Sequence, residues 1–174
     1  MKSFLLLILF AFISSNYIQV NLNCGLKTYY NAVRAAKEFV GKKPKIKQLI
    51  PVALYSSTIH QYYGFKVVVA TQLNNSIHLE EVLIENSTEV VNTTIYDNDP
   101  EEKISNEVYE KVQKSAEKFF KEHGLRMTKI NNVVVKRDFY IVSVLVKNDK
   151  KKRTIVINKN YLGYYMVMAL FYLD

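Results

Sequence analysis

The chain has 174 residues, of which 49% are hydrophobic, and a formal net charge of +8. Its single cysteine, Cys24, excludes an internal disulfide, so the hydrophobic core alone must hold the fold together. The positive charge is modest and spread along the chain without a basic-aromatic motif, which argues against a nucleic-acid-binding protein.

Residues 1–16 are predicted to form a secretory signal peptide. Lys2 precedes an apolar run from Phe4 to Ile13, shorter than the ~20 residues that cross a bilayer, and the small residues Ser14 and Ser15 follow. No later apolar stretch is long enough to span a membrane. The sequence therefore predicts a secreted protein that does not insert stably in membranes.

The segment 17–97 is predicted to hold one helix followed by antiparallel strands. The helix extends from Thr28 to Val40, with Gly41 at its C-terminal cap. Runs of β-branched and aromatic residues, separated by turn residues, then predict strands at 49–63, 65–73, 77–84 and 89–96.

Three Asn-x-Ser/Thr sequons fall within this first segment, at Asn74, Asn86 and Asn92. Beside a signal peptide they predict glycosylation at all three asparagines. A glycan must sit in solvent, so residues 74–94 are also expected to contain exposed turns.

The segment 98–174 is predicted to repeat the same order. Asp99 as N-cap and Pro100 at the first helical position indicate a helix that ends at Gly124. Strands are expected at 127–136, 139–147, 154–158 and 164–172. The last of these is apolar on both faces, which predicts a place at the centre of a sheet or at the contact between the two segments.

No catalytic or metal-binding pattern is present. The three histidines, at positions 60, 78 and 123, have no metal-ligand spacing, and the five glycines form no phosphate-binding loop. Asp97, Asp99 and Glu101 alternate as calcium ligands do, but the central glycine of such a loop is absent, and helix capping explains them better. We therefore expect no enzyme activity, no metal and no cofactor.

The stretch from Leu54 to Thr71 resembles the cystatin segment around the family's Gln-x-Val-x-Gly hairpin. On that match His60 takes the place of the glutamine, Tyr62 that of the valine and Gly64 that of the glycine. In cystatins this hairpin enters the active-site cleft of papain-like cysteine proteases, together with an N-terminal glycine, for which Gly25 is the candidate. The resemblance thus implies a cysteine protease inhibitor that contacts its target through Gly25, His60, Gln61, Tyr62, Tyr63 and Gly64.

The resemblance also implies a fold class: α+β, with two cystatin-like repeats, each a helix packed on an antiparallel β-meander. The first repeat would span 17–97 and the second 98–174. Two units in tandem are similar to latexin, which inhibits metallocarboxypeptidases. The sequence departs from the cystatin pattern in keeping only the glycine of the hairpin motif and in having no Trp for the third contact element.

Two other functions stay open alongside protease inhibition. The protein would be a binding module that inhibits nothing if a groove between the repeats were lined by Tyr164, Met166 and Met168. It would bind membranes or polyanions if the lysine-rich side of the second helix and the charged turn at 150–153 acted together.

Overall fold

The computed structural model describes residues 26–59, 62–100, 102–149 and 152–173. The predicted signal peptide and the N-terminal cysteine and glycine lie outside these ranges. Eight strands, two α-helices and one short 3-10 helix form the described part of the chain. In chain order they are α2 (Leu26–Gly41), β1 (Ile46–Ile59), β2 (Tyr62–Leu73), β3 (Ser76–Glu85), β4 (Glu89–Ile95), η1 (Tyr96–Asn98), α3 (Asn106–Glu122), β5 (Met127–Lys136), β6 (Phe139–Val146), β7 (Lys152–Lys159) and β8 (Tyr165–Leu173).

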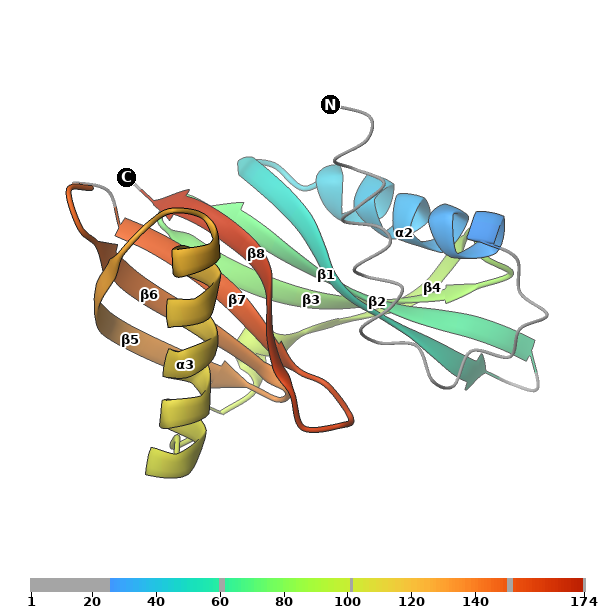
Figure 1. The fold of residues 1–174 in the computed structure, drawn as a ribbon. Coiled ribbons are helices and arrows are strands. Elements are labelled where there is room, and N and C mark those ends of the chain that lie inside the picture. The colour runs from blue at the N-terminus through green and yellow to red at the C-terminus, as the bar shows by residue number, and fades with distance from the viewer. Residues whose placement is uncertain (1–25, 60–61, 101, 150–151, 174) are drawn as a thin grey trace.

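The strands form two antiparallel sheets in which every strand pairs with its neighbour in the chain. The first sheet has the order β1-β2-β3-β4 and the second the order β5-β6-β7-β8. Helix α2 lies against the first sheet and α3 against the second (Figure 1). Within the described residues, no helix is both long and apolar enough to cross a bilayer.

Each helix buries one apolar stripe against its sheet. Ala32, Ala36 and Val40 of α2, spaced four residues apart, are fully buried and pack with strand residues such as Val67 and Ile84. On α3 the same spacing recurs, and the stripe of Val112, Ala116 and Phe120 packs with apolar residues of β5, β6 and β7. Alternate strand residues point to opposite faces, so the other face of each sheet remains to be covered.

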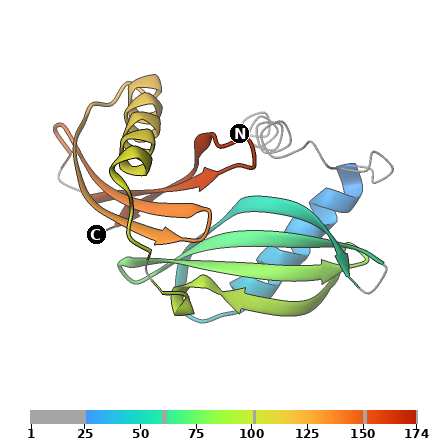
Figure 2. The same cartoon turned by 90° about the horizontal axis from the view of Figure 1, so that it is seen from below.

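The two sheets cover these remaining faces for each other. An apolar cluster joins Val68 and Leu79 of the first sheet to Phe139, Val156 and Phe171 of the second. The helices therefore lie on the outer faces, with the sheets in contact between them (Figures 1 and 2).

Two hydrogen bonds also connect the sheets. The Gln72 Nε2 donates to the carbonyl of Tyr172 at 3.3 Å, and the Asn158 Nδ2 donates to the Tyr55 hydroxyl at 3.4 Å. Gln72 and Asn158 are themselves buried, so these bonds satisfy amide groups that have left water.

The predicted α+β fold of two cystatin-like repeats, each a helix packed on a meander, must be corrected. The structure is mostly antiparallel sheet, with 53% strand against 26% helix, and a layout of one helix per repeat does not describe it well. The physical reason is that apolar residues occur on both faces of the central strands. One helix covers only one face, so direct contact between the sheets supplies a large part of the core.

The predicted start of the second helix was wrong. Helix α3 begins at Asn106, and its N-cap is Ser105, whose hydroxyl accepts a hydrogen bond from the Val108 amide at 3.3 Å. Asp99 instead contacts the second sheet, where its carboxylate accepts from Arg137 Nε at 2.7 Å. An acidic residue before a proline resembles a helix N-cap in sequence. Here the carboxylate of Asp99 forms a tertiary ion pair with Arg137 instead.

The last strand lies at an edge and at the contact between the sheets. β8 is the outermost strand of its sheet, which corrects the alternative of a central position. Its residues Ala169 and Phe171 belong to the cluster between the sheets, and Leu170 packs toward α3. Both faces of an edge strand are covered here because the other sheet lies on one side and a helix on the other.

Candidate functional site

The segment that resembles the cystatin hairpin does not turn at Gly64. Strands β1 and β2 stay paired as far as Ile59 and Tyr62, so their pairing continues past this glycine. Gly64 is buried within β2, paired with Ser57 on one side and Glu85 on the other. The glycine is therefore part of the ladder and not of the turn.

The remaining predicted contact residues lie at the start of β2 or outside the described ranges. Tyr62 and Tyr63 are the first residues of β2. Gly25, His60 and Gln61 lie outside the described residues. The pairing of β2 with β3 places the start of β2 beside the turn 86–88, because Gly64 pairs with Glu85, the last residue of β3.

The three sequon asparagines are exposed. Asn74 and Asn86 occupy the turns after β2 and β3 with positive φ angles of 53° and 48°, a conformation that asparagine adopts more readily than most residues. Asn92 lies on β4, the outermost strand of the first sheet. All three asparagines are thus positioned in solvent, as a glycan requires.

The three residues expected to line a groove between the repeats, Tyr164, Met166 and Met168, differ in how far they are exposed. Tyr164 precedes β8 and is exposed, Met166 is half-buried, and Met168 packs against the apolar cluster between the sheets. None of the three lines the cleft described below.

The loop 160–164 between β7 and β8 is braced from within. The buried Asn160 accepts hydrogen bonds through Oδ1 from the amides of Leu162 at 3.0 Å and Tyr164 at 2.9 Å. Its own amide donates to the Tyr164 carbonyl at 2.9 Å, and its carbonyl accepts from the Gly163 amide at 2.9 Å. Gly163 has φ +82°, which permits this turn without strain.

This braced loop displays three large apolar side chains to solvent. Tyr161 is 61% exposed, Leu162 is 55% exposed and Tyr164 is 65% exposed. Single exposed apolar residues are ordinary on a protein surface, but three within four residues form a local patch. Because the hydrogen bonds of Asn160 order the loop backbone, the three side chains project from defined positions before any partner binds.

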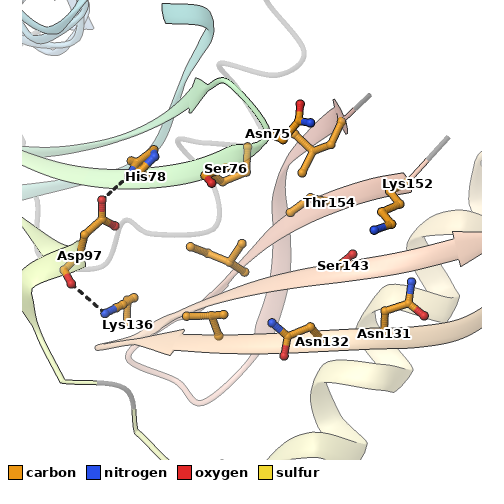
Figure 3. A pocket seen from close by; sticks show the side chains of 14 residues that line it. Asn75, Ser76, His78, Asp97, Asn131, Asn132, Lys136, Ser143, Lys152 and Thr154 are labelled. Atoms are coloured by element: carbon orange, nitrogen blue, oxygen red, sulfur yellow. Dashed lines mark hydrogen bonds and ion pairs between the residues drawn. The ribbon is translucent and has the colours of Figure 1, made fainter.

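A second feature is an open cleft of about 630 Å³ between the two sheets. Figure 3 shows that its walls come from β3 and the turn before it on one side and from β5, β6 and β7 on the other. The apolar side chains lining it are Ile77, Val134, Ile141 and Leu173. The cleft opens where the apolar contact between the sheets ends.

Six of the fourteen residues that line this cleft are polar and uncharged. Asn75 and Ser76 contribute from the first sheet, and Asn131, Asn132 and Ser143 from the second. Each amide carries both donors and acceptors, and each hydroxyl can do either. Such a lining suits a ligand with several hydroxyl groups better than a purely apolar one.

Three of the charged groups in the cleft already have partners. The His78 Nδ1 contacts a carboxylate oxygen of Asp97 (Figure 3). The buried Lys136 donates to the carbonyls of Asp97 at 3.2 Å and Asp99 at 2.6 Å. Lys152 is exposed at the start of β7, and no carboxylate of the described residues pairs with it.

Thr154 lines the same cleft with a buried hydroxyl. The residue is 3% exposed, and its Oγ1 has no hydrogen-bond partner among the described residues. Leaving such a group unsatisfied costs about 1–3 kcal/mol. Figure 3 shows Thr154 beside Ser143 of the neighbouring strand β6 and Lys152 of its own strand β7.

A cluster of polar contacts beside the cleft fastens the sheets together. The Tyr96 hydroxyl donates to Glu81 Oε2 at 2.7 Å, and the guanidinium of Arg137 lies 4.1 Å from the centre of the Tyr96 ring. Arg137 also pairs with Asp99. Burial, reinforced by the hydrogen bond to Glu81, raises the pKa of the Tyr96 hydroxyl well above its ordinary value.

Sequence reasoning missed both the braced loop and the cleft. The loop had a readable signal, because Asn160 and Gly163 flank exposed aromatics between two strands. For the cleft, strand alternation does place Lys152 and Thr154 on one face of β7. No pattern in the sequence indicates that the other sheet leaves this part of the face open.

Comparisons with known proteins identify no relative. No family model, no curated protein and no solved structure matches the chain. Among the described residues, no group of three or more His, Cys, Asp and Glu side chains is arranged to hold a metal ion.

Proposed function

We propose that this protein is a secreted, non-catalytic binding protein that contacts a protein partner through the loop 160–164. The observation that carries this proposal is the exposure of Tyr161, Leu162 and Tyr164 on a loop braced by Asn160. Secretion is supported by the signal-peptide pattern of residues 1–16 and by the exposed sequons.

The loop has the physical properties of a contact element. Tyrosine supplies a large amphipathic surface while losing little side-chain entropy on binding, and it is enriched among the residues that dominate interface energies. A backbone that is already ordered reduces the entropy lost on association. Both the apolar area of the loop and its ordered backbone would therefore contribute to the free energy of binding.

Photo-cross-linking tests this proposal without knowledge of the partner. A benzophenone amino acid replaces Tyr161 in one variant and Tyr30 in a control, since Tyr30 is 52% exposed on α2. Both variants are secreted from the cells that naturally make the protein. We expect a discrete cross-linked species from position 161 only. Equal yields from both positions, or no species from position 161, would contradict the proposal.

A second candidate function is inhibition of a papain-like protease or a carboxypeptidase. It is favoured by the pairing of Gly64 with Glu85, which brings the start of β2 and the 86–88 turn to one end of the first sheet. Two adjacent segments at one end could enter a cleft together. The exposed Asn86 stands in this region, so a glycan there would oppose entry.

Titration of papain and of a pancreatic carboxypeptidase separates the two candidates. If the hairpin inhibits, Tyr62→Ala should weaken inhibition ~10-fold or more, and Tyr161→Ser should leave it unchanged. The reverse result would assign inhibition to the loop 160–164. Full residual activity of both enzymes at micromolar protein would remove the second candidate.

A further inference from the structure

The strongest unexplained feature is the cleft between the sheets, which lies away from the proposed contact loop. Lys152 and Thr154 are at the start of β7, and the loop 160–164 follows the end of the same strand. The two features are thus at opposite ends of β7. A ligand in the cleft would not occupy the loop.

The cleft contains a buried hydroxyl group, that of Thr154, whose hydrogen-bonding capacity is not satisfied by the described residues. Thr154 lies in register between Ser143 of β6 and Phe171 of β8. Ser143 lines the cleft, whereas Phe171 is packed in the apolar cluster. A ligand hydroxyl reaching Thr154 would supply the missing hydrogen bond.

The charges of the cleft favour an anion at one position. Lys136 is held by two backbone carbonyls, and Asp97 is in contact with His78, so these groups are engaged. Lys152 is the cleft's exposed cation without a described carboxylate partner, and it lies beside Thr154 and Ser143 (Figure 3). A carboxylate placed there would be attracted to the ammonium group.

The rest of the lining fits a hydroxylated ring. The amides of Asn75, Asn131 and Asn132 offer paired donors and acceptors for neighbouring hydroxyl groups. Ile77 and Ile141 offer an apolar surface for the C–H face of such a ring. The volume of about 630 Å³ lies within the ~300–1,000 Å³ typical of small-molecule sites.

We infer that the cleft between the two sheets binds a sugar acid, with its carboxylate at Lys152 and a ring hydroxyl at Thr154. The ligand would be either a free uronic acid or a uronic acid unit of a polysaccharide. Both sources share the same carboxylated ring, and they differ in whether the cleft must also accept neighbouring sugars.

Isothermal titration of the mature protein at low salt tests this inference. Glucuronic acid and a hyaluronan tetrasaccharide are the two probes, and glucose is the neutral control. We expect binding of at least one acidic probe at millimolar concentration and weaker binding of glucose. Preference for the monosaccharide would indicate a free sugar acid, and preference for the tetrasaccharide a polysaccharide. Failure of both acidic probes to bind would overturn the inference.

Two variants locate the binding within the cleft. Lys152→Met should weaken binding of the acidic probe ~10-fold without affecting glucose, and Thr154→Val should weaken both ~10-fold, about the value of one hydrogen bond. Lys159→Met, an exposed lysine at the other end of β7, is the matched control and should change nothing. Binding that survives both cleft substitutions would place the ligand elsewhere and overturn the inference.

Thermal unfolding without ligand provides a further check that does not depend on binding. Because the Thr154 hydroxyl is unpartnered, Thr154→Val should leave the melting temperature unchanged or raise it. A clearly lower melting temperature would mean that the hydroxyl is already satisfied, and would overturn its assignment to a ligand. These outcomes are independent of the cross-linking experiment on the loop.

Discussion

The two faces of the second sheet are built from alternate residues of the same strands, yet they are covered differently. On the face toward α3, Val142 and Val144 of β6 are fully buried, as are Ile155 and Ile157 of β7. On the other face, Phe139 is buried against the first sheet, but farther along β6 the same face carries Ser143, which lines the cleft.

The difference follows from what covers each face. A helix can lie across a twisted sheet and bury one continuous stripe of it. Two twisted sheets that meet at an angle stay close over only part of their area and separate elsewhere. The strand residues match this geometry, because the face is apolar where the sheets meet and polar where they diverge. A change from apolar to polar along one face of a strand can therefore mark the edge of a contact between layers.

The largest expected loss of stability comes from truncating a large side chain in the core. Phe171 is fully buried between the sheets, and Phe120 is fully buried on the helix side. Phe171→Ala and Phe120→Ala should each lower the free energy of unfolding by ~3–5 kcal/mol, because each leaves a cavity. Urea titration followed by circular dichroism measures both. A loss of less than ~1 kcal/mol for Phe171→Ala alone would show that the sheets hardly stabilise each other.

Neighbouring residues of β6 provide a sharper test of the same contrast. Val142 faces α3 and is fully buried, whereas Ser143 faces the cleft. Val142→Ala should cost roughly 2 kcal/mol of unfolding free energy from lost burial and packing. Ser143→Ala should change it by less than ~0.5 kcal/mol. Similar losses from both substitutions would indicate that the cleft is closed in solution.

At neutral pH the polar contact beside the cleft should contribute less to stability than the burial of Val142 and more than the hydroxyl of Ser143. Tyr96→Phe removes the hydrogen bond to Glu81 and should cost ~1 kcal/mol. The raised pKa of Tyr96 means that the folded protein keeps this phenol neutral at a pH where the unfolded chain ionises. The contribution of this group is therefore complete below pH ~10 and is lost as the pH rises further.

Unfolding curves of both proteins across alkaline pH measure this contribution. The wild type should lose stability more steeply above pH ~10 than Tyr96→Phe, which lacks the titrating group. Curves that stay parallel through this range would show that the Tyr96 hydroxyl is not buried as described.

Much of the local structure could be predicted from the sequence. A helix over 28–40, a turn between the strands 65–73 and 77–84, and a second helix that ends before Gly124 depend on local spacing and on backbone preferences, and the structure contains all three. The first helix nevertheless begins at Leu26, two residues before the predicted start, and includes Gly41, which was expected at its cap. Gly124 has φ +69°, as expected for a residue that ends a helix.

The failures occurred where a tertiary contact decided the outcome. Asp99 pairs with Arg137 instead of capping α3, and Gly64 lies within a strand and not in a turn because β1 and β2 remain paired past it. Phe65 and Phe139 likewise differ: Phe65 packs on the face toward α2, whereas Phe139 packs between the sheets. A shift of one residue is enough to exchange the faces of a strand.

The candidate site was less predictable than the fold. The conformation of the exposed loop depends on hydrogen bonds between Asn160 and residues at most four positions away. A local pattern of this kind can in principle be recognised in the sequence. The cleft depends on the angle at which the two sheets meet, and this angle cannot be predicted from any local sequence pattern. Thr154 alone would have been assigned to an ordinary half-buried strand position.

Each strand pairs only with the strands next to it in the chain, and this topology affects the order in which the chain folds. Each sheet can form from hairpins that close over short stretches of sequence, which favours rapid zipping of both meanders. The bonds from Gln72 to Tyr172 and from Tyr55 to Asn158 instead join residues separated by 100 and 103 positions. Docking of the sheets is thus the step with the largest loop-closure entropy. We expect the two halves to become ordered first and to come together late, with their apolar inner faces exposed until they do.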